Sequence, residues 1–385
     1  MTMREPTDAA RAGVKIRAVE TIPLRLPFTT AFTIASPSGR TREHVDVLLV
    51  RLVTDAGVAG IGETQAWRRQ GSDHTLASLA SVVRDLFEPL LLGRSPFDIA
   101  ATLDALGWAS ANLYAVAPVA DALYDLVGRL LDVPVCVLLG AAGLRPIAVG
   151  AEIGIPDSEA EAVDLAVEHA RRGFRHLRVK IGLDPLQDLA RIRAIRARLG
   201  DTVQIRADGN AGLRFAEALP LLERLEELDL EFVEQPLALE ELDGMAALAR
   251  ATRIPIAADE SLTTDHSLVE IAARRAASIV QTKVAKNGGL HHVRRLWTIA
   301  EACGIGILPG NHPATSVAVA SVAHLCAAWP TLALVGDFQT GLDHIVADIA
   351  RTPVVVKDGQ LSAPDGPGFG IELDPDAIAR FRVDV

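Results

Sequence analysis

The chain has 385 residues, of which 49% are hydrophobic and 23% are charged, and its formal net charge is −11 at pH 7. This length exceeds one ordinary core, so we expect a barrel of about 250 residues together with a second domain. The acidic balance leaves no basic stripe to meet phosphates, which excludes nucleic acid as an expected partner. No apolar run of about 20 residues predicts a membrane span, and residues 1–13 lack the apolar segment of a signal peptide. We therefore predict a cytoplasmic globular protein.

Residues 14–135 predict an α+β domain, because strand-like segments come first and helical segments follow. Asp55-Ala56-Gly57 is a turn sequence that would join the second and third strands as a hairpin. The expected antiparallel strands are 14–24, 45–53 and 58–61, and the expected helices are 76–91, 97–106 and 117–131.

Two segments of this domain predict loops. Residues 28–40 are rich in Ser, Thr and Gly around Phe32, and residues 63–72 carry Trp67 beside two arginines. Such loops are either plain connections or a lid. We interpret them as a lid, with Phe32 and Trp67 as candidate substrate contacts, because an open barrel mouth needs something that excludes water.

From residue 146 onward strands and helices alternate, which predicts a parallel barrel within residues 146–345. The tail from about residue 350 to residue 385 is rich in Pro and Gly and is expected to return and complete the first domain. The expected barrel strands are 147–151, 177–180, 203–207, 230–233, 256–258, 278–283, 305–309 and 333–336, with amphipathic helices such as 158–171, 185–199, 214–228 and 290–303 between them.

Three acidic residues, Asp208, Glu234 and Asp259, recur at spacings of 26 and 25 residues, and each follows a short apolar run. One strand, one helix and two loops occupy about this length, so the period indicates successive βα units. Because all strands of such a barrel open on the same face, the three carboxylates must converge. Converging carboxylates repel one another unless a cation neutralises them, and oxygen ligands in this number suit Mg²⁺. The sequence therefore predicts a magnesium site, with Mn²⁺ as the alternative ion.

A lysine flanks this predicted metal site on either side. Lys180 ends the expected strand before Asp208, and Lys283 ends the expected strand after Asp259. The pattern predicts two basic groups with a metal ion between them.

At these residues the chain resembles the enolase superfamily, specifically its muconate-lactonizing-enzyme subgroup, over essentially the whole length. The resemblance implies an α+β capping domain on a modified (β/α)₇β barrel, and one Mg²⁺ held by Asp208, Glu234 and Asp259. It also implies a homo-oligomer, either a dimer or an octamer. The motifs that carry the resemblance are Arg178-Val-Lys180, Asp208-Gly-Asn210, Glu234-Gln-Pro236, Asp259-Glu260-Ser261 and Lys283-Val-Ala-Lys286-Asn-Gly-Gly289.

The resemblance further implies that Lys180 and Lys283 form an acid/base pair on opposite faces of a small carboxylate substrate. Removing the α-proton builds negative charge on the carboxylate oxygens, which a divalent cation stabilises. The lysine that acts as base must be neutral, so its pKa has to fall from about 10.4. Positive charge from the metal and from Arg178 or Lys286 would lower it. The same intermediate could instead expel a group from the β-carbon of a suitable substrate.

Two positions depart from the subgroup pattern. Its usual Lys-x-Lys motif is Arg178-Val-Lys180 here, which keeps a positive charge near the metal but cannot lose a proton. The seventh strand ends in 310–315 (Gly-Asn-His-Pro-Ala-Thr), where the subgroup more often has a Met-Leu-Glu-like stretch. These departures leave the substrate open.

Further candidates surround the predicted site. Asn210 would hold either the loop geometry or a metal-bound water, and Glu260 would contact Lys283 or a metal ligand. Asp337, at the end of the last expected strand, is either a site residue or a helix cap. His312 is a candidate substrate contact, and Lys286 is either functional or a plain loop charge.

Three functions remain open from the sequence. The first is an isomerase of a small carboxylate, either a racemase/epimerase or a lactone-forming cycloisomerase. The second is a dehydratase of a β-hydroxy acid or a hydroxy amino acid, such as a hydroxyproline, that uses the same lysines and pairs Asp337 with a substrate ammonium. The third is a non-catalytic barrel, which the presence of both lysines and all three acids disfavours.

Overall fold

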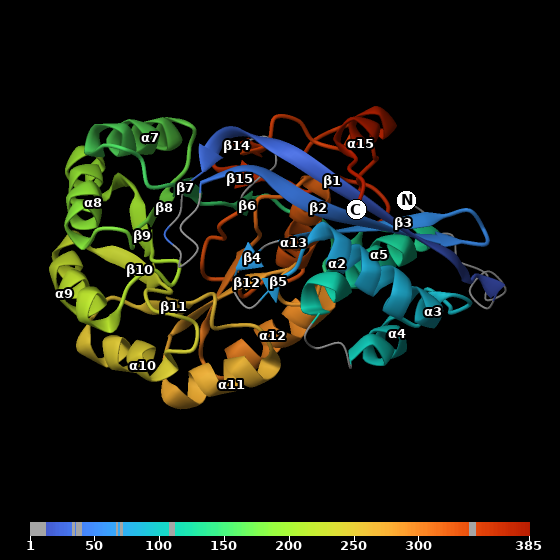
Figure 1. The fold of residues 1–385 in the computed structure, drawn as a ribbon, viewed down its shortest axis with the longest axis horizontal. Coiled ribbons are helices and arrows are strands. Elements are labelled where there is room, and N and C mark those ends of the chain that lie inside the picture. Colours follow the sequence, from blue (N-terminus) through green and yellow to red (C-terminus); the bar gives the residue numbers. More distant parts are fainter. Residues whose placement is uncertain are drawn as a thin grey trace.

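The computed structural model describes residues 13–32, 35, 41–66, 68–69, 72–107, 112–338 and 344–385. Its two main sheets are a three-stranded antiparallel sheet and a seven-stranded parallel sheet. In Figure 1 the antiparallel sheet lies with helices α2 to α5 on one side of the molecule, and helices α7 to α12 surround the parallel sheet on the other. The architecture confirms the predicted α/β fold, a barrel-type domain with an α+β capping domain.

The capping domain is built on strands β1 (Ile16–Phe32), β2 (Arg42–Thr54) and β3 (Ala59–Gln65), in that order in the sheet. Helix α5 (Leu113–Leu131) packs closely on this sheet through Gly60 and Gly62. A Cβ atom at Gly62 would lie only 2.0 Å from the carbonyl oxygen of Pro118, so no larger residue fits there. The remaining helical segments are α2 (Leu76–Ser81), a π-helical turn (Val82–Phe87), α3 (Glu88–Leu91), α4 (Ile99–Leu106) and α6 (Val135–Leu138).

The predicted lid segments are partly wrong. Residues 28–32 belong to strand β1, and residues 63–65 belong to strand β3, where they pair with β2. The reason is that β1 and β2 pair far beyond the predicted ends, as far as Phe32 opposite Arg42. Short strands β4 (Arg68–Arg69) and β5 (Ser72–Asp73) pair with each other in the second segment.

The parallel sheet runs in chain order from β7 to β13, each strand beside the next. Helices between the strands cover its outer face, as a βα repeat requires (Figure 1). The strands are β7 (Ala151–Ile153), β8 (His176–Lys180), β9 (Gln204–Asp208), β10 (Leu230–Glu234), β11 (Ile256–Ala258), β12 (Ile279–Lys283) and β13 (Gly306–Gly310). The helices are α7 (Glu159–Arg171), α8 (Pro185–Leu199), α9 (Phe215–Leu225), α10 (Leu242–Ala251), α11 (Asp265–Arg274), α12 (Leu290–Ala302) and α13 (Ser316–Ala327).

Two predicted barrel strands are wrong in extent. The segment 147–151 divides into β6 (Ile147–Ala148), which pairs with the C-terminal tail, and the start of β7, which pairs with β8. The expected eighth strand 333–336 is reduced to one bridge, Val149 to Gly336, and a second bridge, Gly310 to Asp337, lies directly after it. Gly336 lies so close to the Phe338 ring that an added Cβ would meet it at 2.3 Å, which shows how tightly the chain turns there.

The C-terminal tail contacts both parts of the molecule. Its hairpin of β14 (Val356–Lys357) and β15 (Gln360–Leu361) pairs with β6. Beyond it, α15 (Pro375–Phe381) leads to Val383, whose N–H donates to the carbonyl of Pro23 on β1 at 3.1 Å. None of the helices in the described part of the chain is both long and apolar enough to cross a bilayer.

A buried glutamate joins the capping domain to the barrel. Glu63 on β3 accepts hydrogen bonds from the N–H of Thr315 at 3.0 Å, from the Thr315 hydroxyl and from the N–H of Ala318 at 3.3 Å. These groups form the N-terminus of α13, where a carboxylate satisfies N–H groups that have no partner within the helix. The contact fixes one sheet of the capping domain over the helix that follows the seventh barrel strand.

Replacing this residue with glutamine is expected to change how stability depends on pH. Burial raises the pKa of Glu63 from 4.5 to about 7. A carboxyl group whose pKa is higher in the folded protein stabilises folding, and this stabilisation is fully present at pH values below the pKa of the unfolded chain. The stabilisation is lost as the pH rises through the pKa of the folded protein. The free energy of unfolding of the wild type should therefore fall relative to Glu63→Gln between about pH 4.5 and about pH 7, by up to about 3 kcal/mol. Urea unfolding of both proteins across this range measures the difference, and a constant difference would contradict the prediction.

Candidate active site

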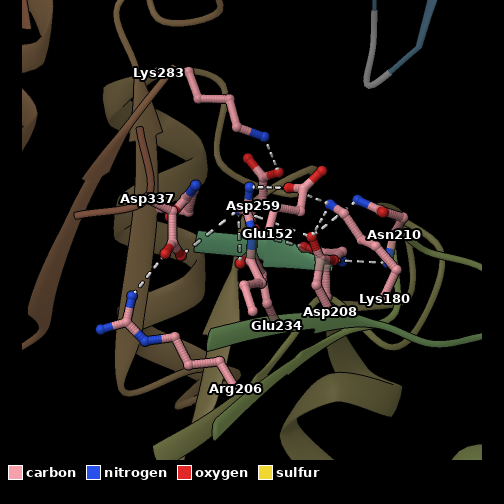
Figure 2. A network of polar contacts seen from close by, with 12 residues as sticks. Glu152, Lys180, Arg206, Asp208, Asn210, Glu234, Asp259, Lys283 and Asp337 are labelled. Carbon is pink, nitrogen blue, oxygen red and sulfur yellow. Dashed lines mark hydrogen bonds and ion pairs between the residues drawn. The ribbon is translucent and has the colours of Figure 1, made fainter. Parts of the chain in front are cut away.

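Charged side chains from successive strands of the parallel sheet meet in one buried cluster (Figure 2). The parallel register sets Lys180 opposite Asp208, and Asp208 opposite Glu234, so these residues lie at the same level of the sheet. The cluster holds six carboxylates and five basic groups, namely Glu152, Asp208, Glu234, Asp259, Glu260 and Asp337 with Arg178, Lys180, Arg206, Lys283 and Lys286. The structure thus brings together the acids and lysines that the sequence predicted.

The two predicted catalytic lysines contact different carboxylates. Lys180 Nζ donates to Asp208 Oδ2 at 2.7 Å and lies 3.2 Å from Glu152 Oε2. Lys283 Nζ donates to Asp259 Oδ2. Figure 2 shows the two side chains entering the cluster from different sides of the acidic group. Both lysines are buried, at 3% and 5% exposure, so water has little access to their ammonium groups.

Arg178 stands at the centre of the charge network. Its guanidinium pairs with Glu152, and its Nη1 lies 3.4 Å from Glu234, 3.9 Å from Asp208 and 3.7 Å from Asp337. Burial alone would lower the pKa of Arg178, but the surrounding carboxylates, led by Glu152, raise it well above its usual value. It remains a fixed positive charge within the cluster.

The donor set of Asp208, Glu234 and Asp259 fits a divalent cation in chemical type, since hard cations prefer carboxylate oxygens. Burial and the charge of Asp208 raise the pKa of Glu234 well above its usual value. Glu234 Oε1 is buried and has no hydrogen-bonding partner among the described residues. In the described ranges no group of three or more His, Cys, Asp or Glu side chains is arranged to hold a metal. An ion bound at these carboxylates would compete with the ammonium groups of Lys180 and Lys283 for them.

The pKa values of Lys283 and Lys286, which both contact Asp259, are shifted in opposite directions. Burial lowers the pKa of Lys283, but the charges of Asp259, Glu234 and Glu260 outweigh it and raise the pKa. Burial lowers the pKa of Lys286, whose Nζ donates to Asp259 Oδ1 at 2.6 Å. A cation on the same carboxylates would weaken their pull on Lys283 and so lower its pKa.

Asn210 contacts one of the predicted ligands, Asp208, and also Glu260. The backbone N–H of Asn210 donates to Asp208 Oδ1 at 2.9 Å, and its side-chain amide donates to Asp208 Oδ2 at 3.2 Å and to Glu260 Oε1 at 3.3 Å. Asn210 has φ of 43°, the left-handed region that asparagine tolerates better than most residues. Burial, with the charges of Asp259 and Asp208, raises the pKa of Glu260 to about 7. The role of Asn210 toward a metal-bound water stays a prediction.

Arg206 is a site residue that the sequence reasoning missed. It is fully buried, and its Nη1 donates to Asp337 Oδ1 at 2.9 Å, while its Nε donates to Glu231 Oε2 at 2.7 Å. Asp337 therefore lies in the cluster between two arginines, Arg206 and Arg178. The sequence did place Arg206 on a barrel strand, two residues before Asp208 and so on the same face of β9.

Glu152 is the second residue that was missed. Its side chain is only 3% exposed and pairs with both Arg178 and Lys180. Burial alone would raise the pKa of Glu152, but Lys180 and Arg178 lower it to about 2. The predicted first strand ended at residue 151, whereas the actual strand β7 runs through Ile153 and carries Glu152. An acidic residue between apolar residues near a strand end was the available signal.

His312 lies at the edge of the cluster, after strand β13. It is buried and stacks on the Tyr114 ring of α5, with ring centroids 5.9 Å apart. Burial and the nearby charge of Lys283 lower the pKa of His312 well below its usual value. The role of His312 as a substrate contact stays a prediction.

The remaining candidates fall on the lid segments. Trp67 and the side chain of Phe32 lie outside the described residues. Ala35, which is described, is fully buried, and an added Cβ at Gly212 or Gly182 would lie 2.9 or 3.0 Å from its Cβ. Ala35 thus lies against the loops that follow β8 and β9.

Both domains match known protein families. Residues 12–140 match the N-terminal domain of the mandelate racemase / muconate lactonizing enzyme family, and residues 161–377 match the family described as Enolase C-terminal domain-like. The chain belongs to the mandelate racemase/muconate lactonizing enzyme family of the enolase superfamily. The predicted resemblance is confirmed, and enzymes of this family typically use a divalent metal.

Its relatives are isomerases that match over nearly their full length. L-Ala-D/L-Glu epimerase of Bacillus subtilis is 31% identical over 93% of this chain and 97% of its own length. Muconate cycloisomerase 1 of Rhodococcus opacus is 33% identical over 96% of this chain and 98% of its own. The crystal structure of N-succinyl Arg/Lys racemase from Bacillus cereus superposes with a TM-score of 0.90 at 27% identity, covering 96% of this chain and 98% of the racemase. The protein is thus an isomerase of the enolase superfamily.

Proposed function

We propose that this enzyme is a Mg²⁺-dependent racemase or epimerase of a small carboxylate, in which Lys180 and Lys283 exchange the α-proton on opposite faces. The observation that carries the proposal is the contact of two ammonium groups with one acidic cluster, Lys180 at Asp208 and Lys283 at Asp259. Inversion at a carbon atom needs a proton acceptor on one face and a proton donor on the other. Two buried lysines that reach the cluster from different strands fit this need.

Asp208, Glu234 and Asp259 would hold the Mg²⁺, with Mn²⁺ as a second candidate. When bound, the ion would stabilise the negative charge that develops on the carboxylate oxygens of the substrate. Asn210 donates a hydrogen bond that orients Asp208, and Arg178 forms an ion pair with Glu234. Such supporting contacts fix the direction of each carboxylate.

The lysines carry the proton. One Nζ takes the α-proton from one face, and the other Nζ returns a proton to the opposite face. Their burial excludes water, which strengthens the electrostatic interactions between the ammonium groups and the substrate carboxylate. His312 is proposed as a substrate contact. Asp337 already pairs with Arg206 and lies near Arg178, so a substrate ammonium would have to compete with both arginines for it.

A lactone-forming cycloisomerase is the second candidate, favoured by the 33% identity to a muconate cycloisomerase. It would need the same metal ligands but proton transfer on one face only. A dehydratase would use the same lysines and expel a β-hydroxyl group. The three reactions differ in the mass and configuration of the product, so one experiment separates them.

The experiment is incubation with Mg²⁺ in D₂O. The probes are L-Ala-L-Glu, L-Lys-L-Arg, N-succinyl-L-Arg, cis,cis-muconate and trans-3-hydroxy-L-proline, whose β-hydroxyl group a dehydratase could expel. The products are analysed by mass spectrometry and chiral chromatography. A racemase or epimerase incorporates one deuterium at the α-carbon and yields the other configuration. A cycloisomerase converts muconate to its lactone, and a dehydratase would yield a product lighter by one water. If the enzyme exchanges the α-proton of none of these probes, the racemase proposal is overturned.

The metal requirement is tested separately from turnover. We expect Mg²⁺ to raise the unfolding temperature, because a ligand bound only by the folded state stabilises it, by about 2.7 kcal/mol at a hundredfold excess over Kd. Glu234→Gln should abolish this shift, and a chelator should abolish turnover reversibly. Glu217→Gln, at a half-exposed position on helix α9 outside the cluster, is the control and should keep the shift. An unchanged Mg²⁺ response in Glu234→Gln would remove Glu234 from the ligand set.

A further inference from the structure

The two lysines of the proposed acid/base pair are held differently, and the difference lies in Glu152. Lys180 stands on β8 between Glu152 of the preceding strand β7 and Asp208 of the following strand β9. Its Nζ is 2.7 Å from Asp208 and 3.2 Å from Glu152. Lys283 instead contacts Asp259, which also binds a second ammonium group, that of Lys286. Lys180 therefore contacts a carboxylate, that of Glu152, which has no role in the proposed mechanism.

The local geometry explains how Glu152 reaches Lys180. Glu152 on β7 is paired with Arg178 on β8, and Lys180 lies two residues after Arg178 on β8. Side chains two residues apart in a strand point to the same face, so Arg178 and Lys180 both face the cluster. Glu152 can then contact Arg178 directly and Lys180 diagonally. Its side chain is 3% exposed, so these contacts are made away from solvent.

We propose that Glu152 is a positioning residue that holds the Lys180 ammonium on its face of the substrate. This inference rests on the proposed function. Asp208 is also a predicted metal ligand, so its oxygens would contact the metal ion as well as Lys180. Glu152 is not a predicted metal ligand, and the same oxygen that pairs with Arg178 contacts Lys180, so Glu152 ties Lys180 to strand β7. The effect of Glu152 should therefore be confined to proton exchange on the Lys180 face.

Asp337 provides a matched control. Like Glu152 it is a buried carboxylate near Arg178, with side-chain exposure of 3%, but it contacts Arg206 and not Lys180. Glu152→Gln and Asp337→Asn each remove one negative charge near the same arginine and keep the volume of the side chain. Any effect that comes only from the charge around Arg178 should appear in both variants. An effect on Lys180 should appear in Glu152→Gln alone.

The test is stereospecific deuterium exchange in the holoenzyme. The probes are L-Ala-L-Glu and L-Ala-D-Glu, and N-succinyl-L-Arg with its D enantiomer, each incubated with Mg²⁺ in D₂O. Lys180→Ala first identifies which configuration loses its proton to Lys180. In Glu152→Gln we expect exchange of that configuration to fall by about 10- to 100-fold, the range expected for a misplaced catalytic group. Exchange of the opposite configuration should stay close to wild type.

Three results would overturn the proposal: an equal fall for both configurations, the same pattern in Asp337→Asn, or no change. If the wild type exchanges no probe, the proposed function fails, and crystal structures of the wild type and Glu152→Gln decide the role of Glu152. Departure of the Lys180 ammonium from its contact with Asp208 in the variant would support positioning. An unchanged Lys180 side chain would refute it.

Discussion

Lys180→Ala and Lys283→Ala are each expected to lower turnover by about 10²- to 10⁴-fold, the usual contribution of a positioned acid or base. Each variant should still bind Mg²⁺, because it removes an ammonium group that competes for Asp208 or Asp259 and leaves all three carboxylates in place. The two variants should differ in one respect. With a chiral probe, each should lose proton exchange from one configuration while keeping exchange from the other.

Steady-state kinetics, deuterium exchange and Mg²⁺ titration by calorimetry measure these effects. Lys357→Ala is the control, since this lysine lies exposed on β14 and should change none of them. Full turnover in either active-site variant would exclude the two-base mechanism. Loss of Mg²⁺ binding in either variant would mean that the lysines support the metal ligands instead of moving protons.

Arg178→Met is expected to cause the largest loss of stability, about 3–5 kcal/mol. Arg178 is 1% exposed. Its guanidinium pairs with Glu152 and lies within 3.9 Å of Glu234, Asp208 and Asp337. Methionine replaces much of its volume but leaves these carboxylates with one cation fewer in a buried site. Urea unfolding without added metal measures the free energy of unfolding directly.

Arg178→Lys should be more stable than Arg178→Met but less stable than the wild type. An ammonium group keeps the positive charge, but unlike the planar guanidinium it cannot contact several carboxylates at once. Arg214→Met is the control: this arginine pairs with Glu217 at the surface with 82% of its side chain exposed, and its removal should leave stability unchanged. A loss in Arg178→Met no larger than in Arg214→Met would show that the cluster tolerates unpaired carboxylates. Added Mg²⁺ should recover part of the loss, since the ion restores positive charge.

The sequence by itself determined the βα repeat and the residues that end its strands. Asp208, Glu234 and Asp259 could be found because a strand–helix unit has a nearly constant length, so residues at equivalent strand ends recur at a regular spacing. Parallel strands then leave no choice about where these ends meet. The same regularity located Lys180 and Lys283, and the structure places both lysines in the acidic cluster.

Only the tertiary structure decided the contacts that have no period in the sequence. The position of Glu152 depends on where strand β7 begins. The pairing of β6 with the C-terminal tail and the bridge from Val149 to Gly336 determine this start, and local propensity does not. Glu63 reaches the N-terminus of α13 over 252 residues of chain. Arg206 meets Asp337 over 131 residues. Such pairs form because buried charges must find partners wherever the fold brings them, and no local pattern records the choice.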